Sequence, residues 1–129
     1  MYGFSVQMSC GFEEAVDKVT DALKTEGFGV LTEIDVKATL KKKIDVDRKP
    51  YKILGACNPG LANQALNADP DIGLLLPCNV VVREEDDGAI TVAFMDPAAV
   101  LGLVHKSGVA ELAGEVRGKL EKVRDQLGA

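Results

Sequence analysis

The sequence has no tryptophan, one histidine and three cysteines, and these scarcities exclude several kinds of protein. Three cysteines are an odd number and none are spaced as CxxC, so the pattern does not indicate the disulfide framework of a small secreted protein. A zinc site needs several Cys or His ligands close together in space, usually in clustered spacing. The available side chains are scattered along the chain, so we predict no metal site: Cys10, Cys57, Cys78 and His105.

Long apolar segments are also missing. The longest apolar run, at 98–104, is far shorter than the roughly 20 residues that span a bilayer. The amino-terminal residues lack the basic region and the apolar core of a signal peptide. We therefore predict a cytoplasmic protein that does not bind membranes.

Acidic residues outnumber basic ones: the chain has fifteen Lys and Arg and twenty Asp and Glu, which gives a net charge of -5. Nucleic-acid-binding proteins usually carry a basic face, so we predict no nucleic-acid partner. The densest basic stretch, at 41–49, is interpreted as a solvated helix end and loop. The common nucleotide, serine-hydrolase and zinc-protease motifs are absent, and we predict no cofactor: GxGxxG, GxxxxGK[ST], GxSxG and HExxH.

Apolar residues in the first half of the chain follow the periods of alternating strands and helices. Alternation at 2–8 and again at 28–34 is typical of half-buried strands. Between them, apolar residues recur at steps of three or four, which predicts an amphipathic helix: Phe12, Val16, Val19 and Leu23. Asp35 is a favourable cap for a short helix to about residue 43, and we expect three apolar residues on its inner face: Val36, Leu40 and Ile44.

The second half continues in the same manner. A strand is predicted at 51–57, a helix from Asn58 to the stop at Asp69, and an apolar run at 72–76 is too short to classify. Strands at 79–83 and 89–95 form a hairpin around Gly88. A helix starts at Asp96, and the last helix keeps a three-or-four spacing for about five turns: Val109, Leu112, Val116, Leu120, Val123 and Leu127.

These elements predict a single α+β domain at 1–129, with a five-stranded, mainly antiparallel sheet and helices on one face. The hairpin requires that at least part of the sheet is antiparallel. An apolar sheet face left uncovered is expected to find a partner. The candidates for this uncovered face are Tyr51, Val80, Val82, Ile90, Val92 and Phe94.

Cys57 lies in the most chemically suggestive place, at the end of a predicted strand and before a helix start formed by Asn58 and Pro59. Backbone N–H groups and the helix dipole favour negative charge there and lower the pKa of a thiol. A nucleophilic, redox-active or ligand-contacting cysteine fits this position. A free cysteine also packs as a small apolar residue in a core, so both interpretations stay open.

A second group of similar chemistry stands at 77–79, where a Cys-Asn pair again lies beside a proline and a strand end. If the third and fourth strands are neighbours, the two thiols lie close together. We therefore predict a ligand-binding pocket formed by Cys57, Asn58, Pro59, Pro77, Cys78 and Asn79. No catalytic residue is assigned, because no spacing links His105 to either thiol.

Three stretches carry a family resemblance: GFGV at 27–30, KILGACNP at 52–59 and DIGLLLPCNVVV at 71–82. They resemble the domain of unknown function 302 family, over nearly the whole chain. The resemblance implies a TATA-binding-protein-like fold, β-α-β-β-β-β-α with short extra helices, and a homodimer in at least some members. It implies no activity, and the fold does not imply DNA binding, because function resides in sites.

Three functions are compatible with these observations. The first is a homodimeric module that binds a small molecule or an anion in the pocket near Cys57 and Cys78. The second is a structural or interaction protein that acts through its dimer interface. The third is a thiol-dependent enzyme or redox protein with Cys57 as the reactive group and Cys78 as its partner.

Overall fold

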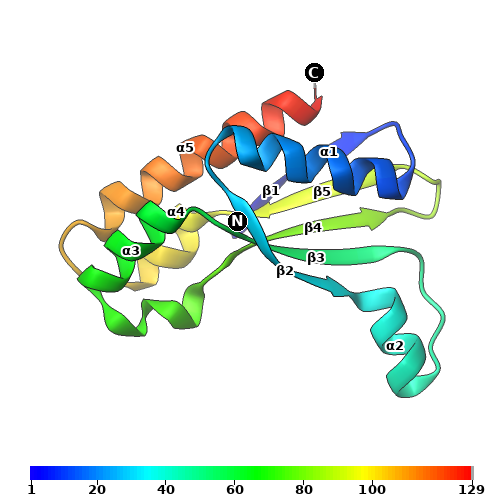
Figure 1. The fold of residues 1–129 in the computed structure, drawn as a ribbon, viewed down its shortest axis with the longest axis horizontal. Coiled ribbons are helices and arrows are strands. Elements are labelled where there is room, and N and C mark those ends of the chain that lie inside the picture. The colour runs from blue at the N-terminus through cyan, green and yellow to red at the C-terminus, as the bar shows by residue number, and fades with distance from the viewer. Residues whose placement is uncertain (129) are drawn as a thin grey trace.

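Five strands form one antiparallel sheet in the order β1-β5-β4-β3-β2 (Figure 1). The structure is a computed structural model and describes residues 1–128. The strands are β1 (Gly3–Met8), β2 (Gly29–Asp35), β3 (Tyr51–Cys57), β4 (Cys78–Glu84) and β5 (Ile90–Met95). All neighbouring strands are antiparallel, so the predicted α+β class with a five-stranded antiparallel sheet is confirmed.

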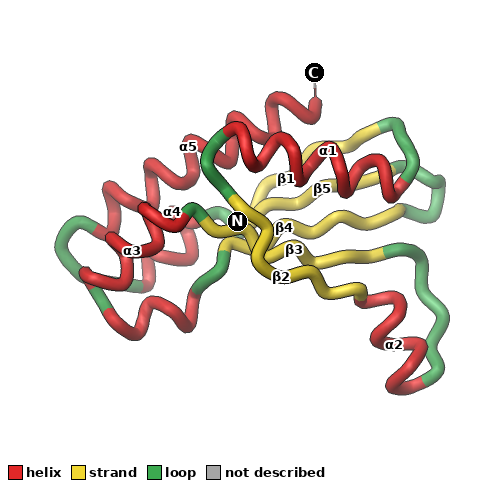
Figure 2. The backbone as a smooth tube through the Cα atoms, in the orientation of Figure 1, coloured by secondary structure: helices red, strands yellow, loops and turns green. Residues whose placement is uncertain are grey.

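Two long helices lie across one face of this sheet, and shorter helices lie at its ends (Figure 2). The long ones are α1 (Phe12–Thr25) and α5 (Val109–Gly128). The shorter ones are α2 (Val36–Ile44), α3 (Pro59–Ala68) and α4 (Pro97–Val100), with two 3₁₀ turns, η1 (Pro70–Leu75) and η2 (Leu101–Leu103). The apolar run at 72–76, which periodicity left unclassified, lies mostly in η1.

Polar residues and glycine set the boundaries of the helices. The Asp35 carboxylate accepts the Ala38 N–H at 2.9 Å and caps α2. The Asn58 amide oxygen caps α3 by accepting the Leu61 N–H at 3.3 Å. After α1 the chain turns at Gly27, whose φ of 84° suits a residue without Cβ. The predicted starts of α2 and α3 follow from these caps.

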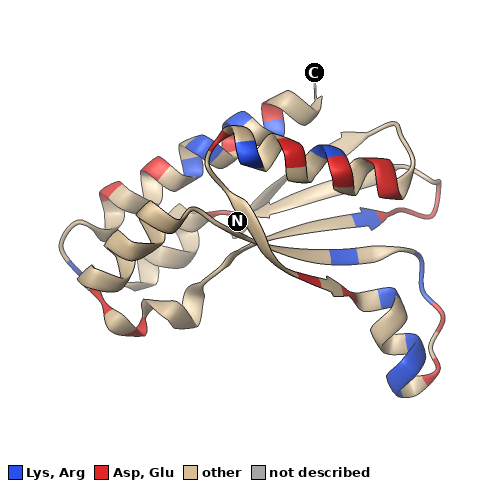
Figure 3. Ribbon diagram, viewed as in Figure 1, with Lys and Arg blue, Asp and Glu red and all other residues tan. Residues whose placement is uncertain are grey.

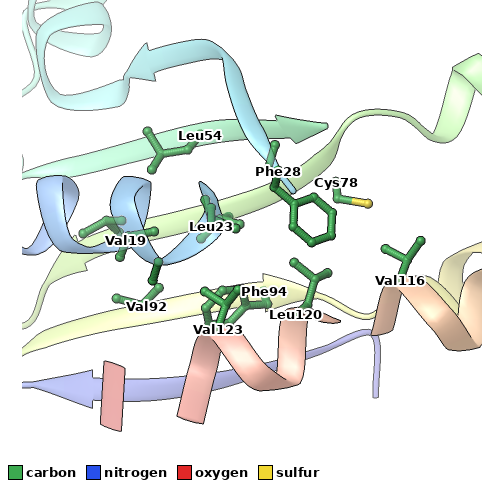
Figure 4. Close-up of a cluster of buried hydrophobic side chains, with 14 of the residues drawn as sticks. Val19, Leu23, Phe28, Leu54, Cys78, Val92, Phe94, Val116, Leu120 and Val123 are labelled. Atoms are coloured by element: carbon green, nitrogen blue, oxygen red, sulfur yellow. The ribbon is translucent and has the colours of Figure 1, made fainter. Parts of the chain in front are cut away.

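The core lies between the sheet and the two long helices. Strand β4 buries every second residue, and its partner in the hairpin buries the residues opposite them. Figure 4 shows side chains of the sheet and of both helices meeting in one apolar cluster, among them Val19, Leu23, Leu54, Val92, Phe94, Leu120 and Val123. Apolar burial of this kind supplies most of the favourable free energy of folding.

The prediction for the uncovered sheet face was wrong for five of its six residues. These residues are at most 1% exposed and belong to the core under α1 and α5: Val80, Val82, Ile90, Val92 and Phe94. Only Tyr51 lies on the other face. Alternation separates the two faces of a strand but does not say which one the helices cover. The uncovered face carries half-buried Ile53, Val81, Ala93 and Met95.

Helix α2 extends from one end of the sheet, away from the other helices (Figure 1). It has no buried residue, and Ile44 is largely exposed. Of the expected inner face, Val36 and Leu40 are the two half-buried residues of the helix, whereas Ile44 was wrongly included. The helices α3 and α4 lie at the opposite end of the sheet.

No helix in residues 1–128 combines the length and the apolar character required to cross a lipid bilayer.

Candidate functional site

An apolar cavity of about 330 Å³ opens at the end of the sheet where β3 finishes and β4 begins. Helix α3 and turn η1 form one wall, and α5 forms another. Twelve of the lining residues are apolar, and six of these are leucines: Phe28, Leu31, Ala56, Leu61, Ala62, Ala65, Leu66, Gly73, Leu76, Leu101, Leu112 and Val116. Four further residues complete the lining: Cys57, Asn58, Pro77 and Cys78.

The structure brings together four of the six residues that the sequence singled out and separates the other two from them. Cys57, Asn58, Pro77 and Cys78 line the cavity, whereas Pro59 and Asn79 do not. Neighbouring residues of a strand point to opposite faces, so Asn79 lies on the uncovered face of the sheet while Cys78 points to the core. Pro59 begins α3 with its ring exposed to solvent.

The strand pairing explains why the two cysteines are close. Strands β3 and β4 are neighbours, and Ala56 is paired with Cys78. Cys57 is the next residue of β3 and is half-buried, whereas Cys78 is 7% exposed. In Figure 4, Cys78 stands with Phe28 and Val116 at one end of the buried cluster.

Burial of Cys78 changes its acidity. Desolvation, and secondarily the nearby Cys57, raises the pKa of the Cys78 thiol from 9.0 to about 11. Both effects disfavour the charged form of the group. A thiol with this pKa is protonated at neutral pH, and a protonated thiol is a poor nucleophile and a poor metal ligand. The geometry therefore gives no support to Cys78 as the resolving partner of a redox pair.

The start of α3 offers few free donors. Pro59 has no N–H, the Leu61 N–H is capped by Asn58, and the Ala62 N–H donates to the Asn58 carbonyl at 2.8 Å. The Asn58 amide also donates to the Glu26 carbonyl at 3.4 Å, which holds the end of α1 against the start of α3. Within residues 1–128, the Gly60 N–H is the one donor of this turn without an acceptor.

Other chemical groups lie away from the cavity. His105 is exposed in the loop before α5 and is not among the lining residues. The three cysteines are free, and within residues 1–128 no group of three His, Cys, Asp or Glu side chains is placed to hold a metal ion. The pairing of His105 with Cys57, which spacing did not support, is not formed.

Sequence reasoning missed twelve of the sixteen lining residues, and half of the twelve come from α3 and α5. Their three-or-four spacing is the same for a cavity wall as for a packed core, so periodicity cannot separate the two. A second signal was present, because α3 has no Asp, Glu, Lys or Arg. Figure 3 shows α3 and α4 without charge colour, in contrast to the coloured α1 and α2.

Comparison with known proteins supports one family. A family model described as "Domain of unknown function DUF302" matches residues 4–127. Among solved structures, a crystal structure of an uncharacterized conserved DUF302 protein from Bacillus stearothermophilus is 31% identical, with a TM-score of 0.91 over 98% of both chains. No curated protein matches the sequence. The chain belongs to the DUF302 family.

Proposed function

We propose that this protein is a small-molecule-binding module and that its ligand occupies the cavity between α3, η1, α5 and the ends of β3 and β4. The observation that carries the proposal is the cavity itself, because four of the six residues chosen from sequence chemistry line it. Its volume of about 330 Å³ falls in the range of small-molecule pockets, roughly 300–1,000 Å³.

A binding role also fits the way the cavity is built. The walls come from elements held by the core, since Leu61, Ala65 and Leu112 are all buried. A rigid, preformed pocket binds with a small loss of conformational freedom. The lining has few polar groups, and such groups usually fix the orientation of a ligand in an apolar pocket. Here they are Cys57 and Asn58.

The test is a thermal-shift measurement against a chemically mixed panel of metabolites at millimolar concentration. A ligand at 100 times its Kd stabilises the folded state by about 2.7 kcal/mol, which raises the midpoint by several degrees. The variant Ala62→Phe fills the cavity from α3, and Asn63→Phe places the same ring on an exposed neighbour that does not line it.

We expect compounds that raise the midpoint of the native protein and of Asn63→Phe but not of Ala62→Phe. The proposal is wrong if no compound raises the midpoint, or if the same compounds stabilise Ala62→Phe equally.

A second function, self-association into a homodimer, is favoured by the uncovered sheet face. A hollow of about 780 Å³ lies on this face, lined in part by Tyr2, Val81, Ala93 and Met95. Tyr2 is 81% exposed, and the other three side chains are half-buried in the isolated chain. Apolar side chains gathered on a sheet face mark an interaction surface. We propose a second copy of the chain as the partner.

Light scattering coupled to size-exclusion chromatography tests this proposal at micromolar concentration. The native protein and the control Asn63→Glu should elute with the mass of a dimer, and Val81→Glu with the mass of a monomer, because the new carboxylate would be buried without a partner. A native protein that is monomeric at this concentration would count against a homodimer.

A further inference from the structure

We infer that the ligand of the cavity is an uncharged molecule made mostly of hydrocarbon, such as a linear alkyl chain with a hydroxyl head, and not an anion or a cation. This inference rests on the proposed small-molecule function and specifies the class of ligand. It follows from three properties of the cavity: its charge, its hydrogen-bond donors and its size.

Charge is the first property. In the part of the chain that the structure describes, no Asp, Glu, Lys, Arg or His lines the cavity. A charged group moved from water into an apolar site without a partner loses its hydration and gains no ion pair in return. The raised pKa of the Cys78 thiol reflects the same environment, since desolvation disfavours its charged form. An uncharged ligand avoids this penalty.

Hydrogen-bond donors are the second property. Anion sites at helix starts use several free backbone N–H groups. In the first turn of α3, proline removes one donor and Asn58 occupies those of Leu61 and Ala62. One N–H is left, at Gly60, and Gly60 does not line the cavity. A phosphate or carboxylate would therefore meet too few donors, whereas one hydroxyl can be served by Cys57 or the Asn58 side chain at the rim.

Size is the third property. At roughly 30 Å³ for each water-sized group, about 330 Å³ holds about eleven non-hydrogen atoms. A ten-carbon alcohol is of this size. Leucines surround the space, with Leu61 and Leu112 buried and Leu66 42% exposed at the rim. Branched apolar side chains of this kind bind an alkyl chain by removing its surface from water.

The experiment compares 1-decanol, decanoate, decylammonium and inorganic phosphate at pH 7.5, by displacement of the uncharged fluorescent probe N-phenyl-1-naphthylamine from the full chain. We expect 1-decanol to bind at least ten times more tightly than either charged analogue, and phosphate to displace no probe. Ala62→Phe should weaken 1-decanol at least tenfold, and Asn63→Phe should not.

A charge introduced at the rim tests the reason for this selectivity. Leu66→Lys places an ammonium group on the cavity wall, and Leu74→Lys places one on η1 at a side chain that is 87% exposed and does not line the cavity. Leu66→Lys should tighten decanoate at least tenfold relative to 1-decanol, while Leu74→Lys keeps the native order.

The outcomes separate this inference from the function on which it rests. If decanoate or phosphate binds the native protein as tightly as 1-decanol and Ala62→Phe abolishes that binding, the cavity binds small molecules but the ligand class is wrong. If none of the four compounds binds, the ligand class is wrong and the mixed metabolite panel decides the cavity site; if Ala62→Phe leaves all binding unchanged, both the ligand class and the cavity site are wrong.

Discussion

Gly55 illustrates how one residue shapes the end of the sheet beside the cavity. A Cβ on Gly55 would lie 2.8 Å from the Pro77 ring and even closer to the Thr32 hydroxyl. Thr32 belongs to β2 and Pro77 precedes β4, so three segments approach each other over this one glycine. Pro77 lines the cavity, and its position therefore depends on the absence of a side chain at Gly55.

We expect Gly55→Ala to destabilise the protein by about 2–3 kcal/mol, because overpacked positions force neighbouring groups to move. Gly29→Ala is the matched control, since Gly29 lies on the adjacent strand and a Cβ added there would meet no heavy atom within 4 Å. Urea unfolding of the two variants measures the difference. Equal stability of Gly55→Ala and Gly29→Ala would show that the close approach is absent in solution.

Cys78 makes folding stability depend on alkaline pH. Its pKa is about 11 in the folded protein and 9.0 as the ordinary value, so the folded state holds its proton more tightly than the unfolded state. The contribution is fully present below pH 9 and is lost as the pH rises from 9 to 11. At 1.36 kcal/mol for each pKa unit, the loss is on the order of 3 kcal/mol.

Chemical unfolding of the native protein and of Cys78→Ala between pH 8 and pH 11 measures this effect. The native protein should lose stability faster than the variant over this interval, although the variant starts from a lower value because it lacks the buried sulfur. Parallel curves would mean that Cys78 is not desolvated.

At the scale of single residues, the sequence predicted which strand ends lie close together but not the orientation of every side chain. Cys57, Asn58, Pro77 and Cys78 line one cavity because they flank two paired strand ends. Asn79 was placed with them, although strand alternation turns it to the face opposite Cys78. Alternation along β4 would have removed Asn79 from the site, but the same rule along β3 groups Cys57 with Tyr51, although Cys57 lines the cavity.

At the scale of elements, helix α2 differs from all the longer helices. It has no buried residue, whereas α1 buries five: Ala15, Val16, Val19, Ala22 and Leu23. The interactions of α2 are local and exposed. They include its cap by Asp35 and the ion pair of Lys41 with Asp45 at 2.8 Å. Exposed ion pairs contribute at most about 1 kcal/mol. Little therefore holds α2 to the rest of the molecule.

Native-state hydrogen exchange should show this difference directly. Amides in α2 are expected to exchange by local opening at a free energy near zero, and those in the middle of α1 by global unfolding, typically at about 5–15 kcal/mol. Equal protection of α1 and α2 in dilute solution would contradict the exposed position of α2.

The elements also show which features of the fold can be predicted from the periodicity of the sequence. The five strands, the two long helices and the caps of α2 and α3 follow from local pattern, since each depends on residues close in sequence. The exposure of Ile44 on α2 and the covered face of the sheet did not follow. Both depend on how elements distant in the chain pack, and the same apolar stripe fits a core, a partner or solvent.

At the scale of the whole molecule, charge is distributed unevenly along the sheet. Charged residues lie on α1, α2, α5 and the hairpin tip, whereas α3 and α4 have none (Figure 3). The cavity opens beside these two uncharged helices, and the acidic residues nearest to it in sequence, such as Asp71 in η1 and Glu111 in α5, are not among its lining residues. Within residues 1–128 no charged side chain lines the cavity, so an apolar ligand bound there does not desolvate a lining ion.

The most direct test of this assignment is methyl NMR of the Leu, Val and Ala side chains during a titration with 1-decanol. We predict saturable shifts at the methyl groups around the cavity, Leu61, Ala65, Leu112 and Val116, with little change at Val81 and Ala93 on the uncovered sheet face. Shifts confined to Val81 and Ala93, or no saturable shift at the cavity methyl groups, would contradict the assignment.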